Sequence, residues 1–421
     1  MGSRPVIVLA GGGTGGHVFP MVAVADALRV EADVRVVYVG TARGIESRVV
    51  PARGDELELL DVLPIKGRGP IGAVRGVVRA VGTLPRARSL VKRLGPCAVL
   101  AVGGYASGPF GFAAWLGRIP LAVLEPNSTL GLTNRWLVPF ARRAYVAFAE
   151  TEDKLGARVA RRTGVPLRKG AFHPTPYVPS AGLRVLVLGG SQGAKALNEV
   201  LPEAFARARR EVGGLTIVHQ AGMGRDEQVR SAYRALGADD WANVVPFLDD
   251  VASELAAADL VIERSGGSSL GELCAIGRPS ILIPFPFAAD DHQRKNARAL
   301  ADAGAAVCVD PTEATAARLA DEVVAIAKDA SRRTAMADRA RSLGRPDAAR
   351  EVARDLLALG GVTTRPSDPG SRPGVAAAAP VPTSSTRPFS RSSKRRLAVG
   401  RRGTRAAAHQ TVGVSDEVAD V

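Results

Sequence analysis

The sequence predicts an α/β fold of two doubly wound domains, in which helices cover both faces of a parallel sheet. Three observations lead to this prediction. Short β-branched runs alternate with helical patterns along residues 1–360, the alternation restarts near residue 184, and glycine-rich turns join strand to helix in both halves. Such alternation is typical of parallel sheets that are buried on both faces.

The first half is expected to contain four buried strands and the helices between them. The expected strands are Val6–Ala10, Val34–Gly40, Ala98–Val102 and Leu121–Leu124. The expected helices are Gly11–Val30, Gly108–Leu116 and Leu132–Phe140. The uncharged run Pro96–Gly117 is long enough to span a bilayer. Because Gly103, Gly104, Gly108 and Pro109 interrupt it, we interpret this run as strand, loop and helix of a soluble domain.

The second half repeats the pattern. Its expected strands are Arg184–Leu188, Thr216–His219, Leu260–Ile262 and Ile281–Ile283. Its expected helices are Ala194–Glu211, Gly267–Ile276 and Gln293–Ala303. A proline-rich stretch from Pro166 to Pro179 suggests the linker, so the domains are expected at residues 1–165 and 166–360. Residues 361–421 contain ten Lys or Arg and four Asp or Glu with little apolar periodicity, which predicts a disordered basic tail.

Composition excludes some classes of protein. The 421 residues carry a formal net charge of +15, and 46% are hydrophobic, as in an ordinary folded protein. The cysteines Cys97, Cys274 and Cys308 are too far apart for a disulfide scaffold or a cysteine-based zinc site. We expect them to be small core residues in a reducing compartment, and no signal peptide is expected before the first strand. The basic tail could bind nucleic acid or anionic lipid, or it could simply be solvated.

The first glycine-rich loop covers Gly11–His17, between an expected strand and an expected helix. Glycine backbones can approach a ligand closely, and the N–H groups at a helix start favour an anion. The spacing also matches the dinucleotide fingerprint, but the second strand ends without the acid that would hold an NAD ribose, although Arg43 could suit NADP. We expect His17 to point into the ligand site, with a structural or capping role as the alternative.

Two further glycine-rich loops occupy equivalent positions after strands, at Gly103–Pro109 and Gly189–Lys195. Ligands of open α/β sheets bind at the carboxyl ends of strands, so both loops are candidate binding segments. A tight turn without a ligand is the alternative for the first of them. The loop Gly189–Lys195 lacks the Gly-Lys-Ser/Thr ending of a P-loop. Its backbone N–H groups and the Ser191 hydroxyl could still bind a phosphate or a sugar.

The segment Ile262–Glu272 is the fourth glycine-rich turn that begins a helix. Glu272 lies one turn inside this helix, where a carboxylate beside an anion site suits the two hydroxyls of a ribose. A solvated helix acid is the alternative. The polar segment Asp290–Asn296 follows the next strand at the same edge. Its residues suit a helix cap and sugar hydroxyls better than a metal ion, so we expect no metal site.

In this order the motifs resemble those of one enzyme family. They are GGTGGHVFP (Gly12–Pro20), GGYASGP (Gly103–Pro109), LTNRWL (Leu132–Leu137), GGSQGA (Gly189–Ala194), RSG (Arg264–Gly266) and DDHQRKNA (Asp290–Ala297). Residues 5–357 resemble the MurG family of peptidoglycan N-acetylglucosaminyltransferases. The resemblance implies a GT-B fold, two Rossmann-like domains that face a cleft. It also implies transfer of GlcNAc from UDP-GlcNAc to the C4 hydroxyl of MurNAc on lipid I, with inversion, giving lipid II without a cofactor.

The resemblance assigns roles to residues at the motif positions. His17 and Glu125 would be catalytic, with His17 either taking the acceptor proton or binding the acceptor diphosphate. Glu272 would bind the ribose, Leu248 would lie near uracil, and His292 would face the GlcNAc hydroxyls. The other substrate contacts would come from Thr14, Gly15, Gly16, Tyr105, Ser107, Asn127, Arg168, Ser191, Gly267, Ser268, Ser269, Leu270, Gly271 and Gln293.

The chain departs from the family pattern at two places. The family usually has His-Glu-Gln-Asn where this chain has Leu124–Asn127, and Gly-Asn-Pro-Val-Arg where it has Gly164–Arg168. Glu125, Asn127 and Arg168 are retained. These changes leave open a related enzyme with another lipid or a small-molecule acceptor, or a UDP-sugar-binding protein without turnover.

Residues 66–93 are the expected contact with an anionic membrane. Eight basic residues interleave there with Ile, Val and Leu, and no acid occurs. Such a helix suits a lipid surface, which would make the protein peripheral on the cytoplasmic face of the cell membrane. A basic helix packed on the core is the alternative. Nucleic acid is disfavoured because the segment has no aromatic residue to stack on bases, and other cell-wall or division proteins are further candidate partners.

Overall fold

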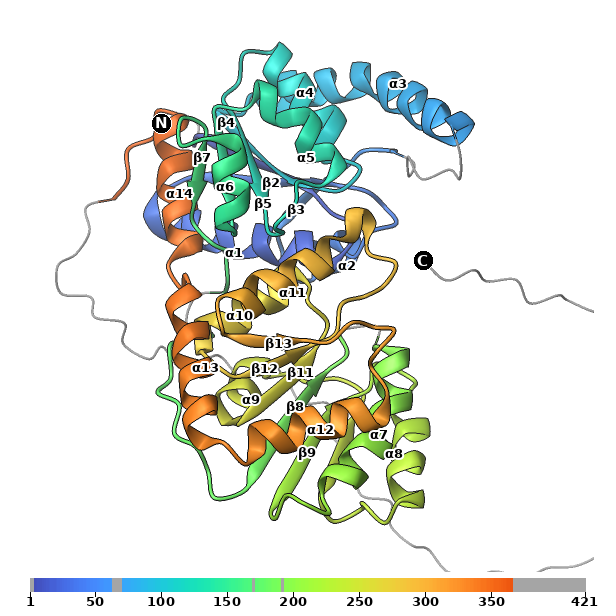
Figure 1. Ribbon diagram of the computed structural model, residues 1–421. Coiled ribbons are helices and arrows are strands. Elements are labelled where there is room, and N and C mark those ends of the chain that lie inside the picture. Colours follow the sequence, from blue (N-terminus) through green and yellow to red (C-terminus); the bar gives the residue numbers. More distant parts are fainter. Residues whose placement is uncertain (1–3, 63–69, 169–170, 191–192, 366–421) are drawn as a thin grey trace, which may run out of the picture. The chain divides into compact units, whose positions relative to one another are not determined.

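The computed structural model describes residues 4–62, 70–168, 171–190 and 193–365, except for the side chains of residues 70–81. The described chain forms two α/β domains, each built on a parallel sheet with helices on both faces (Figure 1). This is the fold class that the sequence predicts. The expected ligand contact Ser191, residues 66–69 and the tail from residue 366 lie outside the described residues.

The first sheet pairs its described strands in the order β3-β2-β1-β4-β5-β6-β7, all parallel. The strands are β1 Val6–Gly11, β2 Arg35–Gly40, β3 Glu56–Leu59, β4 Ala98–Gly103, β5 Leu121–Glu125, β6 Arg143–Val146 and β7 Ala160–Arg162. The four strands predicted for this half are confirmed. The unpredicted β3, β6 and β7 have only three or four residues, too few to show an apolar pattern.

Helices cover both faces of the first sheet. One face packs against α1 (Gly15–Glu31), and the other packs against α3 (Pro70–Leu94) and α4 (Ser107–Leu116). The shorter helices of this domain are α2 Glu46–Ala52, α5 Leu132–Leu137, η1 Val138–Phe140 and α6 Ala149–Leu155. The run Pro96–Gly117 is strand, loop and helix, as predicted. Among the helices that the structure describes, none is long and apolar enough to cross a membrane.

Helix α1 begins four residues later than predicted. Gly12 and Gly13 have φ of +146° and +93°, which a right-handed helix cannot include. These two glycines therefore form the turn, and the helix starts at Gly15.

The second sheet is also parallel, in the order β10-β9-β8-β11-β12-β13. The strands are β8 Leu183–Leu188, β9 Leu215–Gln220, β10 Ala242–Val245, β11 Leu260–Glu263, β12 Ser280–Leu282 and β13 Ala306–Cys308. The helices are α7 Lys195–Ala208, α8 Asp226–Ala235, α9 Val251–Ala257, α10 Gly267–Ile276, η2 Ala289–Asp291, α11 His292–Asp302, α12 Ala316–Ala327, α13 Ala330–Leu343 and α14 Ala348–Leu359. The four strands and three helices predicted for this half are all present.

The strand order of each sheet reverses once. The reversal lies between β1 and β4 in the first sheet and between β8 and β11 in the second. The four glycine-rich segments follow these four strands. In open α/β sheets a ligand binds outside the carboxyl ends of the strands at such a reversal. The topology therefore places all four predicted loops at the two binding edges.

The last helix returns to the first domain. Val352 and Leu356 of α14 are buried in the core beneath α1. Glu31 at the end of α1 accepts hydrogen bonds from Nε of Arg350 (2.8 Å) and Nε of Arg354 (2.7 Å). The domain boundary expected from the sequence assigns α14 to the second domain. In the structure, however, the apolar face of α14 is buried against the first domain.

The described end of α3 packs on the core of the first domain. Ala87 and Leu90 are buried there, whereas Arg86 and Lys92 are exposed. In this part of residues 66–93, the apolar stripe therefore faces protein and the basic side chains face solvent.

Candidate active site

The first glycine loop leaves the start of α1 open. Thr14 is the N-cap residue, but its side chain makes no capping hydrogen bond. Its hydroxyl lies 3.4 Å from Nδ1 of His17 instead. Because the first N–H groups of a helix have no acceptor within the helix, the turn at Gly15 and Gly16 offers donors to an anion.

Glu46, the first residue of α2, holds this loop in place. Its Oε2 accepts a hydrogen bond from the Gly13 N–H at 2.8 Å, and its Oε1 accepts from the N–H (2.8 Å) and the hydroxyl (3.0 Å) of Thr41. The carboxylate is fully buried, and a Cβ on Gly12 would lie 2.2 Å from Oε1. No motif in the sequence marks Glu46 as a site residue, because its contact with Gly13 joins residues 33 positions apart.

The second glycine loop packs directly against the first. A Cβ on Gly104 would lie 2.4 Å from the Gly12 carbonyl oxygen, and a Cβ on Gly103 would lie 2.9 Å from Nε2 of His17. Both Gly103 and Gly104 also have positive φ, +99° and +83°. Glycine at these positions therefore lets the second loop reach the imidazole.

Tyr105 and Ser107 belong to this second loop and are both expected to bind substrate. Ser107 is fully buried, and its hydroxyl donates to the Gly104 carbonyl at 3.0 Å. Tyr105 is half-buried and packs against the core of the first domain. The geometry therefore favours a structural role for the Ser107 hydroxyl, in the turn itself.

His17 is held as a neutral imidazole with one free nitrogen. Its Nδ1 lies 3.1 Å from the Gly12 carbonyl oxygen. Since a carbonyl can only accept, Nδ1 carries the hydrogen, and Nε2 of the neutral ring keeps a lone pair. Burial lowers the pKa of His17, and the negative charges of Glu125 and Glu46 only partly oppose this shift. Nε2 is therefore able to take a proton at neutral pH.

Glu125, at the end of β5, has hydrogen bonds to both carboxylate oxygens. Oε1 accepts from the N–H and the side-chain amide of Asn127 at 3.1 and 3.0 Å. Oε2 accepts from the Gly131 N–H at 2.8 Å and the Asn134 side-chain amide at 3.0 Å. The carboxylate is buried. These contacts anchor residues 125–134 and favour a positioning role for Glu125 over the catalytic role that the resemblance implies.

Asn296 of α11 ties the second domain to this anchor. Its Nδ2 donates to Oδ1 of Asn127 at 3.1 Å and to the Ser265 carbonyl at 3.0 Å. Its Oδ1 accepts from the Ser128 N–H at 2.8 Å, and the side chain is fully buried. The hydrogen bond to Ser265 lies within the second domain, and we call the two hydrogen bonds to Asn127 and Ser128 the interdomain clasp. Asn296 was expected to suit sugar hydroxyls, but the hydrogen bonds that the structure gives its side chain all go to protein groups.

The start of α10 meets the first domain at two places, the start of α1 and the segment after β5. The Ser268 hydroxyl donates to the Gly16 carbonyl at 3.3 Å. A Cβ on Gly267 would lie 2.2 Å from the Pro126 carbonyl oxygen. The N-cap residue Gly266 supplies no side-chain acceptor to the helix. The structure thus brings predicted binding residues of both domains to one place.

Glu272 lies one turn into α10, close to Arg168. Burial raises the pKa of Glu272 to about 7, and the positive charge of Arg168 opposes this shift. Burial also raises the pKa of Glu263, with the charge of Glu272 as the second cause. Oε1 of Glu263 has no hydrogen-bond partner among the described residues. The Glu272 carboxylate accepts no hydrogen bond from another described residue, so the hydroxyls of a bound ribose could supply its donors.

His292 and Gln293 begin α11 on the same side. Oε1 of Gln293 accepts from the Phe285 N–H at 2.9 Å, and Nδ1 of His292 donates to the Ala289 carbonyl at 2.7 Å. In the described part of the chain, these contacts leave the amide nitrogen of Gln293 and Nε2 of His292 available to a ligand. The charge of His292 also lowers the pKa of His17, so the two imidazoles are neighbours across the domains.

The expectation that Asp290 and Asp291 cap α11 is wrong. Asp291 is the N-cap residue but makes no capping hydrogen bond, and both residues have positive φ, +53° and +54°. Asp290 pairs with Arg135 of α5 at 3.3 Å, and Asp291 pairs with Arg294 at 3.0 Å. No group of His, Cys, Asp or Glu within the described ranges could hold a metal ion.

The remaining predicted contacts differ in exposure. Leu248 is half-buried on the core of the second domain, next to the exposed Phe247. Ser269 is half-buried, and Leu270 is buried. Gly271 faces the connection that follows β7, because a Cβ there would lie 2.9 Å from the Cβ of Val165. Leu270 and Gly271 therefore contribute packing rather than polar groups.

Comparisons with known proteins place this site in a family. Residues 7–146 match the N-terminal domain of glycosyltransferase family 28, and residues 184–352 match its C-terminal domain. A UDP-N-acetylglucosamine–N-acetylmuramyl-(pentapeptide) pyrophosphoryl-undecaprenol N-acetylglucosamine transferase of Sorangium cellulosum is 56% identical over 84% of this chain and 88% of its own length. The crystal structure of Acinetobacter baumannii MurG matches 84% of this chain and 99% of its own, with 31% identity and a TM-score of 0.69.

The chain belongs to the MurG family of glycosyltransferases. It therefore has the GT-B architecture of two Rossmann-like domains and is a glycosyltransferase. A UDP-GlcNAc 2-epimerase of Neisseria meningitidis, 12% identical, covers 84% of this chain and 100% of its own with a TM-score of 0.60, and it shares the fold alone. In this chain the loops after β1 and β4, Glu46 and the start of α10 lie around His17.

Proposed function

We propose that this chain transfers GlcNAc from UDP-GlcNAc to the C4 hydroxyl of MurNAc in lipid I, with inversion, to give lipid II in peptidoglycan synthesis. The main support is the junction at His17, where loops from both domains meet around an imidazole with an available lone pair. The substrate names come from relatives such as the Sorangium cellulosum enzyme.

The donor is assigned to the second domain. Glu272 accepts hydrogen bonds from the two ribose hydroxyls, and Arg168 lies near it. The uncapped start of α10 faces the diphosphate with the N–H groups of Gly267 and Ser268. As the sugar leaves, charge grows on UDP, and these N–H groups together with Arg168 stabilise it.

The acceptor is assigned to the first domain. The open start of α1 suits the acceptor diphosphate, as its N–H groups have no intrahelical partners. Nε2 of His17 removes the proton of the attacking hydroxyl, which a neutral imidazole can do at physiological pH. Glu125 acts through Asn127 as a positioning residue, and Gln293 and His292 face the GlcNAc hydroxyls.

The two departures from the family pattern support the same acceptor rather than another one. Leu124 is fully buried in the core of the first domain. Val165 is buried, and its Cβ lies against Gly271. Leu167 and Pro126, which replace the family's Val and Gln, are buried as well, so all four substitutions change packing inside the protein.

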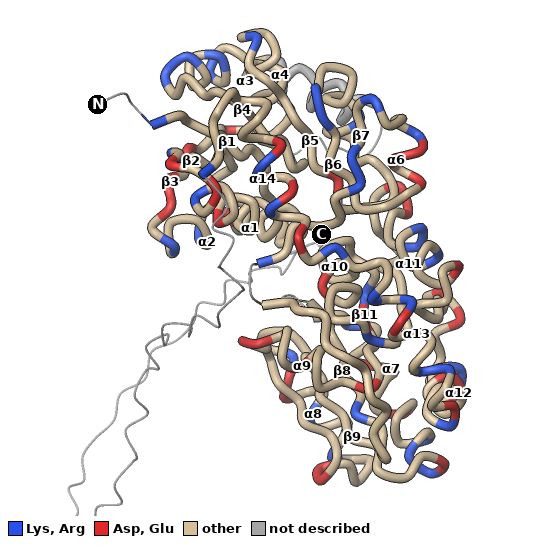
Figure 2. Tube along the Cα trace, turned by 90° about the vertical axis from the view of Figure 1, so that its left-hand side faces the viewer, with Lys and Arg blue, Asp and Glu red and all other residues tan. Residues whose placement is uncertain are grey.

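Membrane association through residues 66–93 is a further part of the proposal. Figure 2 shows Lys and Arg along α3. Nearby on α4 and α5, Trp115 and Trp136 are 40% and 48% exposed, and Trp115 stacks with Phe140 at 4.5 Å between ring centroids. Basic residues beside exposed Trp side chains suit the interface of an anionic membrane, where an undecaprenyl-linked acceptor would lie.

A single-turnover assay with UDP-GlcNAc and a short-chain lipid I analogue tests the function. We expect release of UDP together with a β-1,4-linked disaccharide. Binding of UDP-GlcNAc without transfer to this acceptor would instead favour another acceptor. Sedimentation with vesicles that contain anionic lipid, compared with neutral vesicles, tests the membrane contact.

A further inference from the structure

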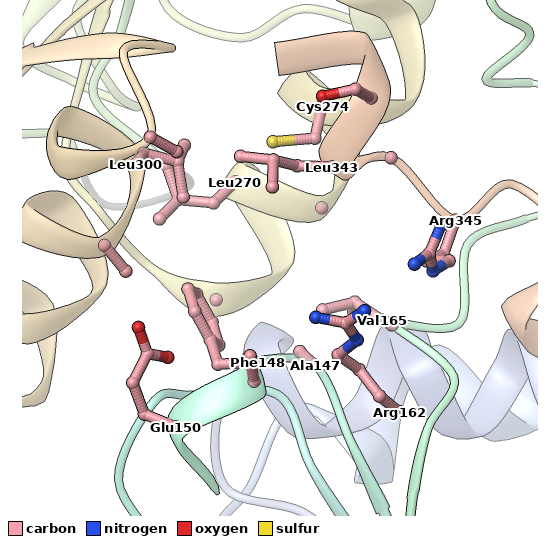
Figure 3. A pocket seen from close by; sticks show the side chains of 18 residues that line it. Ala147, Phe148, Glu150, Arg162, Val165, Leu270, Cys274, Leu300, Leu343 and Arg345 are labelled. Atoms are coloured by element: carbon pink, nitrogen blue, oxygen red, sulfur yellow. The ribbon is translucent and has the colours of Figure 1, made fainter. Parts of the chain in front are cut away.

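A cavity of about 280 Å³ lies behind α10, where the two domains join (Figure 3). Four residues of α10 line it, at spacings that place them on one face of the helix: Gly267, Leu270, Gly271 and Cys274. Ser268 and Glu272 lie on a different face of the same helix. The cavity therefore lies on another face of α10 than Ser268 and Glu272, and it shares with the donor site only Gly267, whose N–H is assigned to the diphosphate.

Both connections between the domains line this cavity. The first runs on from β7 and contributes Arg162, Gly164 and Val165, and the second joins α13 to α14 and contributes Gly344 and Arg345. The two connections touch, since a Cβ on Gly164 would lie 2.5 Å from the Cβ of Arg345. A change in the angle between the domains must therefore change the shape of the cavity.

The cavity has an apolar interior and a basic end. Phe148 and Leu300 line the interior together with Leu270 and Leu343 of the helices around it. Figure 3 shows Arg162 and Arg345 together on one side and Glu150 on the other.

Neither arginine is firmly paired. Arg162 lies 3.8 Å from Glu152, in an exposed ion pair. The Arg345 side chain is exposed and has no hydrogen bond or ion pair with another described residue. The two cations, one from each connection, are therefore free to bind a shared anion.

We propose that this hinge cavity binds a small amphiphilic anion, a phosphate or carboxylate on a short apolar body, and that its occupancy sets how far the domains close. The anionic group lies between Arg162 and Arg345, and the apolar body packs against Phe148 and Leu270. Glu150 disfavours the reverse orientation. The volume lies near the lower limit for small-molecule sites, roughly 300–1,000 Å³, which restricts the ligand to a small one.

Calorimetric titration of the full chain tests the site, with octyl phosphate and octanoate as probes and octanol as the neutral control, all below micelle-forming concentrations. We expect saturable binding of at least one anion, and binding of octanol about tenfold weaker or undetectable. The difference between the phosphate and the carboxylate probe identifies the preferred head group.

Three variants locate the binding. Arg345→Ala should lower the affinity for the anion about tenfold. Ala299→Leu, which fills the cavity, should abolish anion binding. Arg339→Ala, an exposed residue of α13 that does not line the cavity, should leave binding unchanged. Thermal melting confirms that each variant is folded. Equal binding of octanol, or anion binding that both Arg345→Ala and Ala299→Leu leave intact, overturns the proposal.

Titration of UDP-GlcNAc with and without the preferred anion tests the coupling to closure. We expect a change in donor affinity of about fivefold in the natural chain and none in Ala299→Leu. An unchanged donor affinity in the natural chain refutes the coupling. This readout does not depend on sugar transfer, so failure here is distinguishable from failure of the proposed reaction.

Discussion

Nδ2 of Asn296 donates a hydrogen bond to Oδ1 of Asn127 at 3.1 Å, although the two residues belong to different domains and are 169 positions apart. The Nδ2 of Asn127 donates to Oε1 of Glu125 in turn. The orientation of the Asn127 amide is thus fixed from both domains at once. The loop beside His17 therefore has its full set of contacts only when the domains are closed.

Substitution Asn296→Ala removes the interdomain clasp. The side chain loses three buried hydrogen bonds of about 0.5–1.5 kcal/mol each, two of which form the clasp. We therefore expect the free energy of unfolding to fall by roughly 1.5–4.5 kcal/mol. We also expect kcat to fall more than the affinity for UDP-GlcNAc, because the acceptor side loses its orientation. Urea unfolding and steady-state kinetics measure both. The exposed neighbour Arg298 supplies the control Arg298→Ala, and an equal loss in both variants would rule out the clasp.

Substitution His17→Ala tests the general base. Loss of a positioned base should lower kcat by a factor of about 10²–10⁴. Because the pKa of His17 is lowered below 6.5, the natural enzyme should keep its rate as pH falls towards 6.5 and lose it only below that value. The pH profile of kcat measures this. If the loss of rate at acidic pH persists unchanged in His17→Ala, a group other than His17 causes it.

Substitution Glu125→Gln tests the positioning role. The new amide would place a donor against the N–H groups of Asn127 or Gly131, so we expect a loss of roughly 1–3 kcal/mol in the free energy of unfolding. The negative charge of Glu125 raises the pKa of His17, so its removal should move the acidic limb of the rate profile to lower pH. A profile whose acidic limb vanishes altogether would instead make Glu125 the titrating base.

Binding of UDP-GlcNAc should depend on the ionisation of Glu272. The pKa of Glu272 is raised to about 7, and only the carboxylate accepts hydrogen bonds from both ribose hydroxyls. Donor affinity should therefore fall as pH drops below about 7, by up to about tenfold per pH unit. Glu272→Gln should bind more weakly at pH 8 and show no such dependence. Calorimetric titrations with UDP-GlcNAc from pH 5.5 to 8.5 measure the donor affinity of both proteins. A donor affinity of the natural enzyme that does not change over this range would contradict the role of Glu272.

Local patterns in the sequence were sufficient for the fold and for the binding loops. A buried parallel strand is a short apolar run, and a glycine-rich turn follows it within a few residues, so both signals lie in one stretch of chain. The segments after β1, β4, β8 and β11 were predicted for this reason. Strands such as β7, with three residues that include Arg161 and Arg162, carry no such signal.

Only the tertiary structure decided which residues hold the loops around His17 in place. Glu46 reaches Gly13 across 33 positions, and Asn296 reaches Ser128 across 168, distances over which no local pattern extends. The motif position of Ser107 predicts a substrate contact, and only the structure shows that its hydroxyl donates to the Gly104 carbonyl. The sequence by itself determined the longer strands, the helices that follow the glycine-rich turns and the positions of those turns, because these depend on neighbours in the chain. The partner of each buried polar group depends on how the sheets pack, and that was decided in three dimensions.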